Sequence, residues 1–170
     1  MAVQAQATGK TTPAPQSTDA VALLTADHEE VKQLFKQYEK LVDAESSDDG
    51  KALLAQQICT MLTVHTTTEE DILYPAARAA LDEDELVDEA TVEHASIKEL
   101  ITQILQSSPD DDLYDAKVKV LGEHVDHHVK EEEDELFPKL KEAGLDLGAL
   151  GGKLSVRKQQ LTSDADATEA

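Results

Sequence analysis

Four segments of the chain place an apolar residue at every third or fourth position, and clusters of polar turn residues separate them. This spacing is typical of helices that bury one face. The expected helices cover residues from about 19 to 45, 51 to 81, 82 to 106 and 110 to 144. Their inward-facing residues are Leu24, Val31, Phe35, Tyr38 and Val42 in the first; Leu54, Ile58, Met61, Ile72 and Ala76 in the second; Val87, Ala90, Ile97, Ile101 and Ile104 in the third; and Val118, Leu121, Val125 and Leu136 in the fourth. No run of alternating apolar and polar residues indicates a strand, so the pattern predicts an all-α fold.

Short connections between the four helices favour antiparallel neighbours, in an up-down-up-down four-helix bundle. Pro75 is expected to kink or end the second helix, and the fourth meets Pro138 before it closes at Gly144. The bundle is expected to span residues 18–144. Residues 1–17, rich in Gln, Ala, Thr and Pro, are predicted to be a disordered tail. Residues 145–170, which carry three glycines and a polar end, are predicted to be a mostly disordered extension.

The composition suits one domain and narrows the range of partners. The chain has 170 residues, of which 40% are hydrophobic, enough for one sizeable core. Fifteen Lys+Arg against 36 Asp+Glu give a net charge of −21, which repels phosphate backbones and anionic lipids. Since the chain also lacks the roughly 18 consecutive apolar residues of a membrane span, we expect neither nucleic acid nor a membrane as partner. Cys59, the only cysteine, cannot form an intramolecular disulfide, so we expect a cytoplasmic protein.

Four of the six histidines interrupt the apolar stripes, one in each expected helix: His28, His65, His94 and His128. Any one of them alone is more simply explained as a core or boundary histidine. Four unpaired imidazoles, however, would each need a hydrogen-bond partner that an interior rich in Leu and Ile does not supply. A rise of 1.5 Å per residue, counted from the expected turns, places all four within about one helical turn of the same level. A shared metal site satisfies them together.

A repeated motif adds a glutamate to two of these histidines. His65 to Pro75 and His128 to Pro138 both read His-x3-Glu-x5-Pro, with the glutamate doubled and an apolar-aromatic pair before the proline. Residues four apart share one helix face, so each copy offers one nitrogen and one oxygen to the same point in the core. The alternative, that the two glutamates are solvated surface charges, is disfavoured because both lie on the apolar stripe.

Four imidazoles and two carboxylates exceed the four ligands of one tetrahedral zinc site. They suit two metal ions, each bound by two histidines and both bridged by Glu69 and Glu132. Nitrogen and oxygen ligands without thiolate favour iron, with manganese or zinc as alternatives. His124, one turn before His128, either supplies a fifth nitrogen or contacts the ligands from outside, and His127 is expected to face solvent. The Glu-x-x-His motif of ferritin-like di-iron proteins is absent.

The chain resembles the hemerythrin-like, or HHE cation-binding, domains of bacteria. The resemblance rests on residues 27–35, 65–75, 93–98 and 127–138, and it covers roughly residues 19 to 143. It implies a four-helix bundle with a non-haem di-iron centre, whose ligands correspond to His28, His65, Glu69, His94, His128 and Glu132. The oxygen-carrying hemerythrins of invertebrates are similar but have two histidines four apart on the third helix. Here the residues four positions from His94 are Ala90 and Lys98, which brings the chain closer to the bacterial domains.

The resemblance implies that the centre binds or reduces a small oxidant, namely dioxygen, peroxide or nitric oxide, in an oxygen or oxidative and nitrosative stress response. With four histidines, the two irons keep open or water-filled positions at which such a molecule reacts. Three functions remain open at this point. The oxidant is bound reversibly, or an enzyme with catalase-like, peroxidase-like or oxidase activity turns it over, or the iron itself is the cargo.

Overall fold

A computed structural model describes residues 19–82 and 84–168, and these residues form helices joined by short turns, with no strand among them. The all-α prediction is confirmed. The first helix is α1 (Ala20–Asp43), and α2 (Asp48–Thr68) continues through the π-helical turn η1 (Glu69–Leu73) into α3 (Tyr74–Ala80). After α4 (Glu85–Leu105), α5 (Tyr114–Glu131) continues through η2 (Glu132–Leu136) into α6 (Phe137–Glu142), and α7 (Leu147–Thr168) follows. The tail predicted for residues 1–17 lies outside the described residues.

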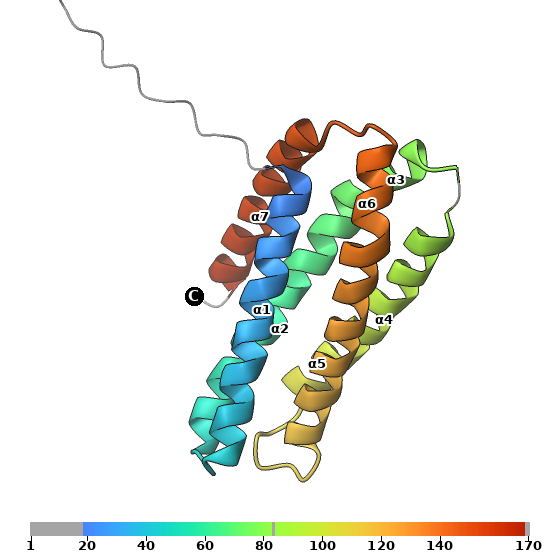
Figure 1. Cartoon of the computed structure of the whole chain (residues 1–170). Helices are drawn as coiled ribbons and strands as arrows, with labels where there is room; N and C mark the ends of the chain where they lie inside the picture. The colour runs from blue at the N-terminus through green and yellow to red at the C-terminus, as the bar shows by residue number, and fades with distance from the viewer. Residues whose placement is uncertain (1–18, 83, 169–170) are drawn as a thin grey trace, which may run out of the picture.

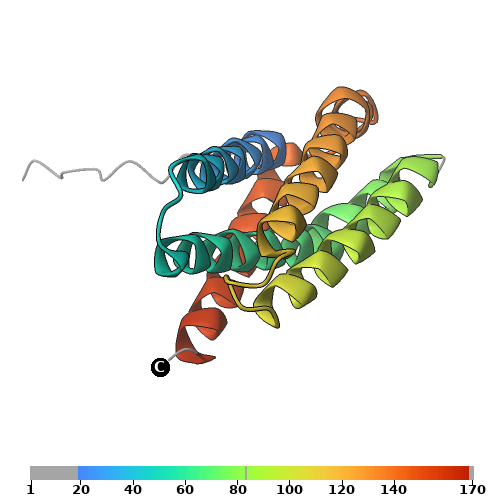
Figure 2. The same ribbon diagram turned by 90° about the horizontal axis from the view of Figure 1, so that it is seen from below.

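Four helical rods pack around a common axis. The rods are α1, α2 with α3, α4, and α5 with α6, and Figure 1 shows each running opposite to the one before it. α1 packs against α2 and α5, and α4 packs against the same two helices, so every rod has two neighbours. Figure 2 shows these rods from below, with α7 crossing them on one side. The inward faces of all four rods therefore meet along the axis.

Two π-helical turns let the rods continue through their prolines. Pro75 and Pro138 lack an N–H, and in a regular α-helix each ring collides with the carbonyl four residues earlier. In η1 the N–H of Tyr74 bonds to the carbonyl of Glu69, five residues back, and in η2 the N–H of Phe137 bonds to the carbonyl of Glu132. The widened turns absorb the prolines without ending the helices. They also bring the residue before each proline onto the same face as the glutamate.

The C-terminal segment is a helix, which corrects the prediction of a mostly disordered extension over residues 145–170. α7 packs against α1, α2 and η1. Asp146 accepts a hydrogen bond from the N–H of Ala149 at its start, and Leu150 and Leu154 are buried. Glycines lower the intrinsic helix propensity of this segment, but burial of its leucines outweighs that penalty. The bundle therefore has a fifth helix that the sequence pattern did not predict.

A layer of buried polar side chains divides the apolar core into two clusters. One cluster includes Val31, Ile58 and Val118, and the other includes Leu24 and Leu136. The buried polar residues are Asp27, His28, His65, Thr66, Thr68, Glu69, His94, His128 and Glu132. None of the described helices is long and apolar enough to cross a membrane. A polar layer inside such a core needs a compensating interaction.

Candidate metal centre

All six predicted ligands lie in the polar layer, and they come from all four rods. Their exposed fractions run from 0% for Glu69 and His94 to 6% for His65. Their ligand atoms form two groups, and the atoms of each group lie within 4.8 Å of one another. The first group is His28, His65, Glu69 and Glu132, and the second is Glu69, His94 and His128. Glu69 belongs to both groups, as a shared ligand would.

Each of the two glutamates lies between a histidine of one group and a histidine of the other. Glu69 Oε2 lies 3.2 Å from His65 Nε2 and 3.3 Å from His94 Nε2. Glu132 Oε2 repeats this arrangement with the remaining two imidazoles, at 3.4 and 3.6 Å. The pattern is that of two carboxylates placed between two pairs of imidazoles.

The outward nitrogen of every imidazole contacts a second carboxylate that the sequence analysis did not assign. The four Nδ1-to-carboxylate contacts are His28 with Glu133 at 2.8 Å, His65 with Asp27 at 3.5 Å, His94 with Glu70 at 3.0 Å, and His128 with Glu93 at 2.8 Å. Such contacts favour the tautomer in which Nδ1 donates its proton outward and the Nε2 lone pair points inward. All four rings are therefore turned to bind a cation through Nε2.

These contacts follow a rule that is visible in the sequence once the fold is known. Asp27 and Glu93 directly precede His28 and His94, and each contacts the histidine of the next helix along the chain. Glu70 is the second member of its glutamate doublet and contacts the histidine of α4; the second member of the other doublet contacts the histidine of α1. The doublet in each motif and the acid before each of the two histidines were the available signals. In a chain with 36 acidic residues, these signals did not distinguish the four acids from the rest.

Several buried atoms of the centre, all but one of them facing inward, have no hydrogen-bond partner among the described residues, and this is the main test of whether a metal fits. The buried atoms without a partner among the described residues are His28 Nε2, His65 Nδ1, His65 Nε2, both Glu69 carboxylate oxygens and Glu132 Oε2. Buried polar atoms are nearly always satisfied in folded proteins. Divalent cations among these nitrogens and oxygens would satisfy them, so the residues present fit a dinuclear metal site.

The pKa values of buried groups in the centre also indicate that positive charge is favoured there. Burial alone would lower the pKa of His65, but the carboxylates of Glu69, Asp27 and Glu132 outweigh it and raise the pKa to about 10. For the carboxyl group of Glu69 the signs are reversed. Burial alone would raise its pKa, but the imidazoles of His65 and His94 hold it well below its usual range. Burial opposes a charge on His128 as well, but its pKa is raised, chiefly by Glu132. Without a metal, protons on His65 and His128 compensate the buried carboxylates, and a bound cation would replace them.

Comparison with known proteins agrees with this arrangement. Residues 19–140 match the model of the Hemerythrin HHE cation binding domain. The chain belongs to this family. A solved structure of an HHE cation binding domain-containing protein from Mycobacterium kansasii superposes with a TM-score of 0.72 at 23% identity, covering 87% of this chain and 90% of that one. This likeness supports the fold alone.

A further relative is described by an activity on DNA and not by cation binding. It is a DNA nickase from Nostoc sp. strain PCC 7120, 29% identical over 119 residues. The aligned region is 70% of this chain but 32% of that protein. The chain therefore spans about a third of the length of this relative.

Tyr74 is a further polar group in the centre of the HHE domain, and the sequence analysis treated it only as part of the motif. Its hydroxyl donates to Glu132 Oε1 at 3.1 Å and lies 3.1 Å from His94 Nε2. The second copy of the motif has Phe137 at this position, and its ring stacks on His28 at a centroid distance of 6.0 Å. Both aromatics follow the π-helical turns, five residues after the glutamates. The two halves of the centre are thus chemically different.

The two remaining histidines lie outside the buried groups. His124 is exposed on α5 and takes part in neither group, so the structure does not bring a fifth imidazole to the centre. The side chain of His127 is 65% exposed, as expected, and its Nε2 lies 3.3 Å from Glu93 Oε1. The six-residue set is what the fold of the HHE domain brings together.

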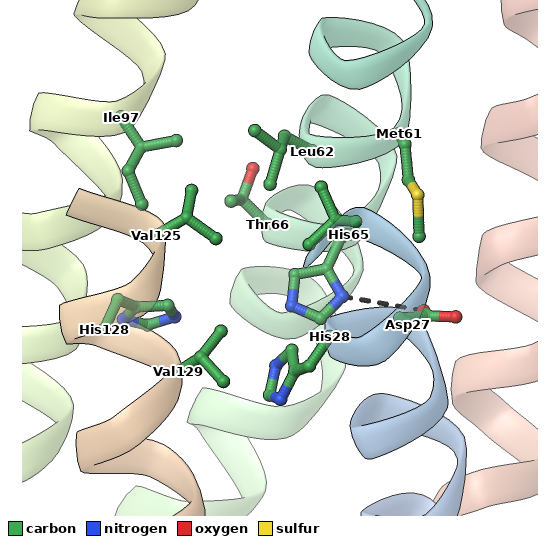
Figure 3. A pocket seen from close by; sticks show the side chains of 11 residues that line it. Asp27, His28, Met61, Leu62, His65, Thr66, Ile97, Val125, His128 and Val129 are labelled. Atoms are coloured by element: carbon green, nitrogen blue, oxygen red, sulfur yellow. Dashed lines mark ion pairs between the residues drawn. The ribbon is translucent and has the colours of Figure 1, made fainter. Parts of the chain in front are cut away.

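A small cavity, here called the inner cavity, lies beside the histidines. Its volume is about 10 Å³, and its lining includes His28, His65 and His128 together with aliphatic side chains such as Val31 and Val125. Figure 3 shows the three imidazoles turned toward this space, with Asp27 beside His65. A volume of ~10–15 Å³ by this measure holds about one water molecule. Only a molecule of a few atoms fits next to the imidazoles.

Proposed function

We propose that this HHE domain binds two iron ions and that the resulting centre binds or reacts with a small oxidant: dioxygen, peroxide or nitric oxide. The observation that carries the proposal is the set of six buried histidines and glutamates, in which two carboxylates lie between two pairs of imidazoles. The unpartnered atoms among them support a dinuclear cation site over a purely structural polar layer. The proposed role is in oxygen or oxidative and nitrosative stress response.

The ligands divide between the two ions by their grouping. His28 and His65 would hold one ion, and His94 and His128 the other. Glu69 belongs to both groups, and Glu132 would be shared through its position between His28 and His128. Imidazole and carboxylate without thiolate favour iron, with manganese or zinc as alternatives. When bound, a di-iron pair supplies electrons and open coordination positions for a small oxidant.

The chain's own residues support a small reactant. The inner cavity excludes anything much larger than a diatomic molecule or peroxide, and its aliphatic lining keeps bulk water away from the imidazoles. The carboxylates on Nδ1 hold the rings in place. Tyr74 places a hydroxyl proton at Glu132 Oε1, on the side of the centre near His94. Removal of that hydroxyl should change the reactivity of one half more than the other.

DNA nicking is not proposed for this chain. The chain covers 32% of the Nostoc relative, so most of that protein has no counterpart here. The net charge of −21 also opposes contact with a phosphate backbone. We propose no nucleic acid partner.

The test is reconstitution with ferrous iron under nitrogen, followed by addition of air, peroxide or nitric oxide. We expect two iron ions per chain and a change in the visible spectrum with at least one of the three. Peroxide consumption over many turnovers would identify an enzyme, whereas a spectrum that reverses on removal of the gas would identify a binding protein. His94→Ala should lose iron, while the exposed His127→Ala should keep it. One iron or fewer in the intact chain would refute the dinuclear site.

A further inference from the structure

A groove open to solvent lies next to the inner cavity and shares two lining residues with it. The groove has a volume of about 590 Å³ and is lined by residues of α1, α2 and α7, among them Leu34, Leu53 and Thr162. Met61 and Asp27 line both the groove and the inner cavity. These two side chains therefore form the partition between solvent and the imidazoles. Figure 3 shows Met61 and Asp27 on the same side of the cavity, the side on which the pale red ribbon of α7 is drawn.

The two side chains of the partition differ in their freedom to move. Asp27 is 6% exposed, forms an ion pair with Lys158 of α7 and contacts His65 Nδ1, so it is held from both sides. Met61 is half-buried, and its unbranched thioether rotates about three bonds. Rotation of Met61 alone would open the partition, because Asp27 can stay in place.

We propose that this groove is the entrance to the dinuclear centre and that Met61 is its gate. The inference rests on the proposed function, since it assigns the route by which a small oxidant reaches the ligands. The walls of the entrance carry the carboxylates of Asp27 and Glu30 against the single ammonium of Lys158. Together with the size of the inner cavity, this favours small uncharged molecules such as dioxygen, nitric oxide and hydrogen peroxide over anions and chelators.

The gate also assigns a task to α7. Lys158 and Thr162 of this helix line the outer wall of the groove, and Lys158 fixes Asp27. Without α7 the groove would lose this wall and Asp27 its ion pair. The fifth helix thus restricts access to a centre whose proposed ligands all come from the other four rods.

The first experiment follows dioxygen itself and needs no reaction at iron. Zinc-loaded protein, labelled at its methyl groups, is placed under oxygen pressure, and the paramagnetic relaxation of each methyl group is measured by NMR. We expect enhancement at Val31 and Val125, which line the inner cavity. The enhancement should fall in Met61→Phe and rise in Met61→Ala. Leu54→Phe, at a half-buried position of the same helix that lines neither space, should leave it unchanged.

The second experiment measures the bimolecular rate of the ferrous protein with dioxygen by stopped flow. We expect Met61→Phe to slow it about tenfold, equivalent to about 1.4 kcal/mol in the barrier. Met61→Ala should accelerate the reaction, and Leu54→Phe should leave its rate unchanged. Iron content and melting temperature are measured for every variant, so that a change in rate is not mistaken for a loss of metal or of folding. Because the two Met61 variants are expected to act in opposite directions, a loss of folding in one does not decide the result.

The outcomes separate the gate from the function. If dioxygen reaches Val31 in a Met61-dependent way but the ferrous protein does not react, the entrance stands and the proposed function is wrong. If the unchanged chain, Met61→Phe and Met61→Ala react with dioxygen at the same rate and show the same methyl relaxation, the function stands and Met61 is not the gate.

Discussion

Metal removal should destabilise the bundle by an amount that follows from the unpartnered atoms. Six buried polar atoms lack a hydrogen bond, and His65 Nδ1 is set aside because it contacts Asp27 at 3.5 Å, which leaves five facing the centre. At about 1 kcal/mol each, the lower end of the penalty for an unsatisfied buried group, they sum to about 5 kcal/mol. This sum is the upper limit at pH 7, because the raised pKa values of His65 and His128 keep protons there that partly replace the cation. For a chain of this size, ~2–4 °C per kcal/mol gives a difference in Tm of at most about 10–20 °C.

The assay compares thermal melts of iron-loaded protein with those of protein stripped by a chelator under reducing conditions, at pH 7 and a fixed free-metal concentration. His127→Ala, altered at an exposed histidine, should show the same difference as the unchanged chain. A difference below about 2 °C would refute the reasoning, because it would mean that these atoms face no cation in the folded protein.

Three further predictions concern a ligand, a pH dependence and the fifth helix. His128→Ala should lose at least one metal per chain, whereas His124→Ala should keep both, as metal analysis will show. Burial opposes a charge on His65 in metal-free protein, but nearby carboxylates raise its pKa from 6.5 to about 10. Its contribution to stability is therefore complete below about pH 6.5 and lost as the pH rises toward 10. Urea unfolding should show this decline without iron and not with it, since bound imidazoles carry no inward proton. Leu154→Ala, at a fully buried position of α7, should lower the free energy of unfolding by about 2–5 kcal/mol in the same assay.

Each of these has a contrary result. Equal metal loss in the two histidine variants would make His124 a fifth ligand. Stability of the metal-free protein that rises between pH 6.5 and 10 would show that His65 is neutral when buried. An unchanged unfolding free energy in Leu154→Ala would mean that α7 is detached from the bundle in solution.

The sequence predicted the four rods and the gathering of six side chains because both depend on spacing along a helix. The spacing of His65 on α2 and Glu69 at the start of η1 survives in the fold, since the π-helical turn begins only at the glutamate. Tyr74 was missed as a member of the centre because regular helical geometry does not place residues five apart on one face. The widened turn does so. The periodicity of the segment does not indicate that turn, and Pro75 was the one signal for it in the sequence.

The outer carboxylates and α7 were missed for a different reason. Glu133 lies in an acidic run that reads as a solvated face, and its contact with His28 depends on a helix more than 100 residues away in sequence. The prediction for residues 145–170 weighed three glycines and a polar end. The burial of Leu150 and Leu154 is not visible in the local sequence, because it depends on the surfaces of other helices. Local propensity was overridden by tertiary packing in this segment.

The four outward contacts of the histidines have a mechanical consequence. They join α1 to η2, α2 to α1, α4 to η1 and α5 to α4, so each neighbouring pair of rods is tied once and the ties close into a loop. Sliding any rod by one turn, about 5.4 Å, would break two ties at the same moment. The bundle therefore resists slippage between rods in either direction. Any motion that accompanies uptake or release of a ligand must take place in side chains and in the two widened turns, while the rods keep their heights.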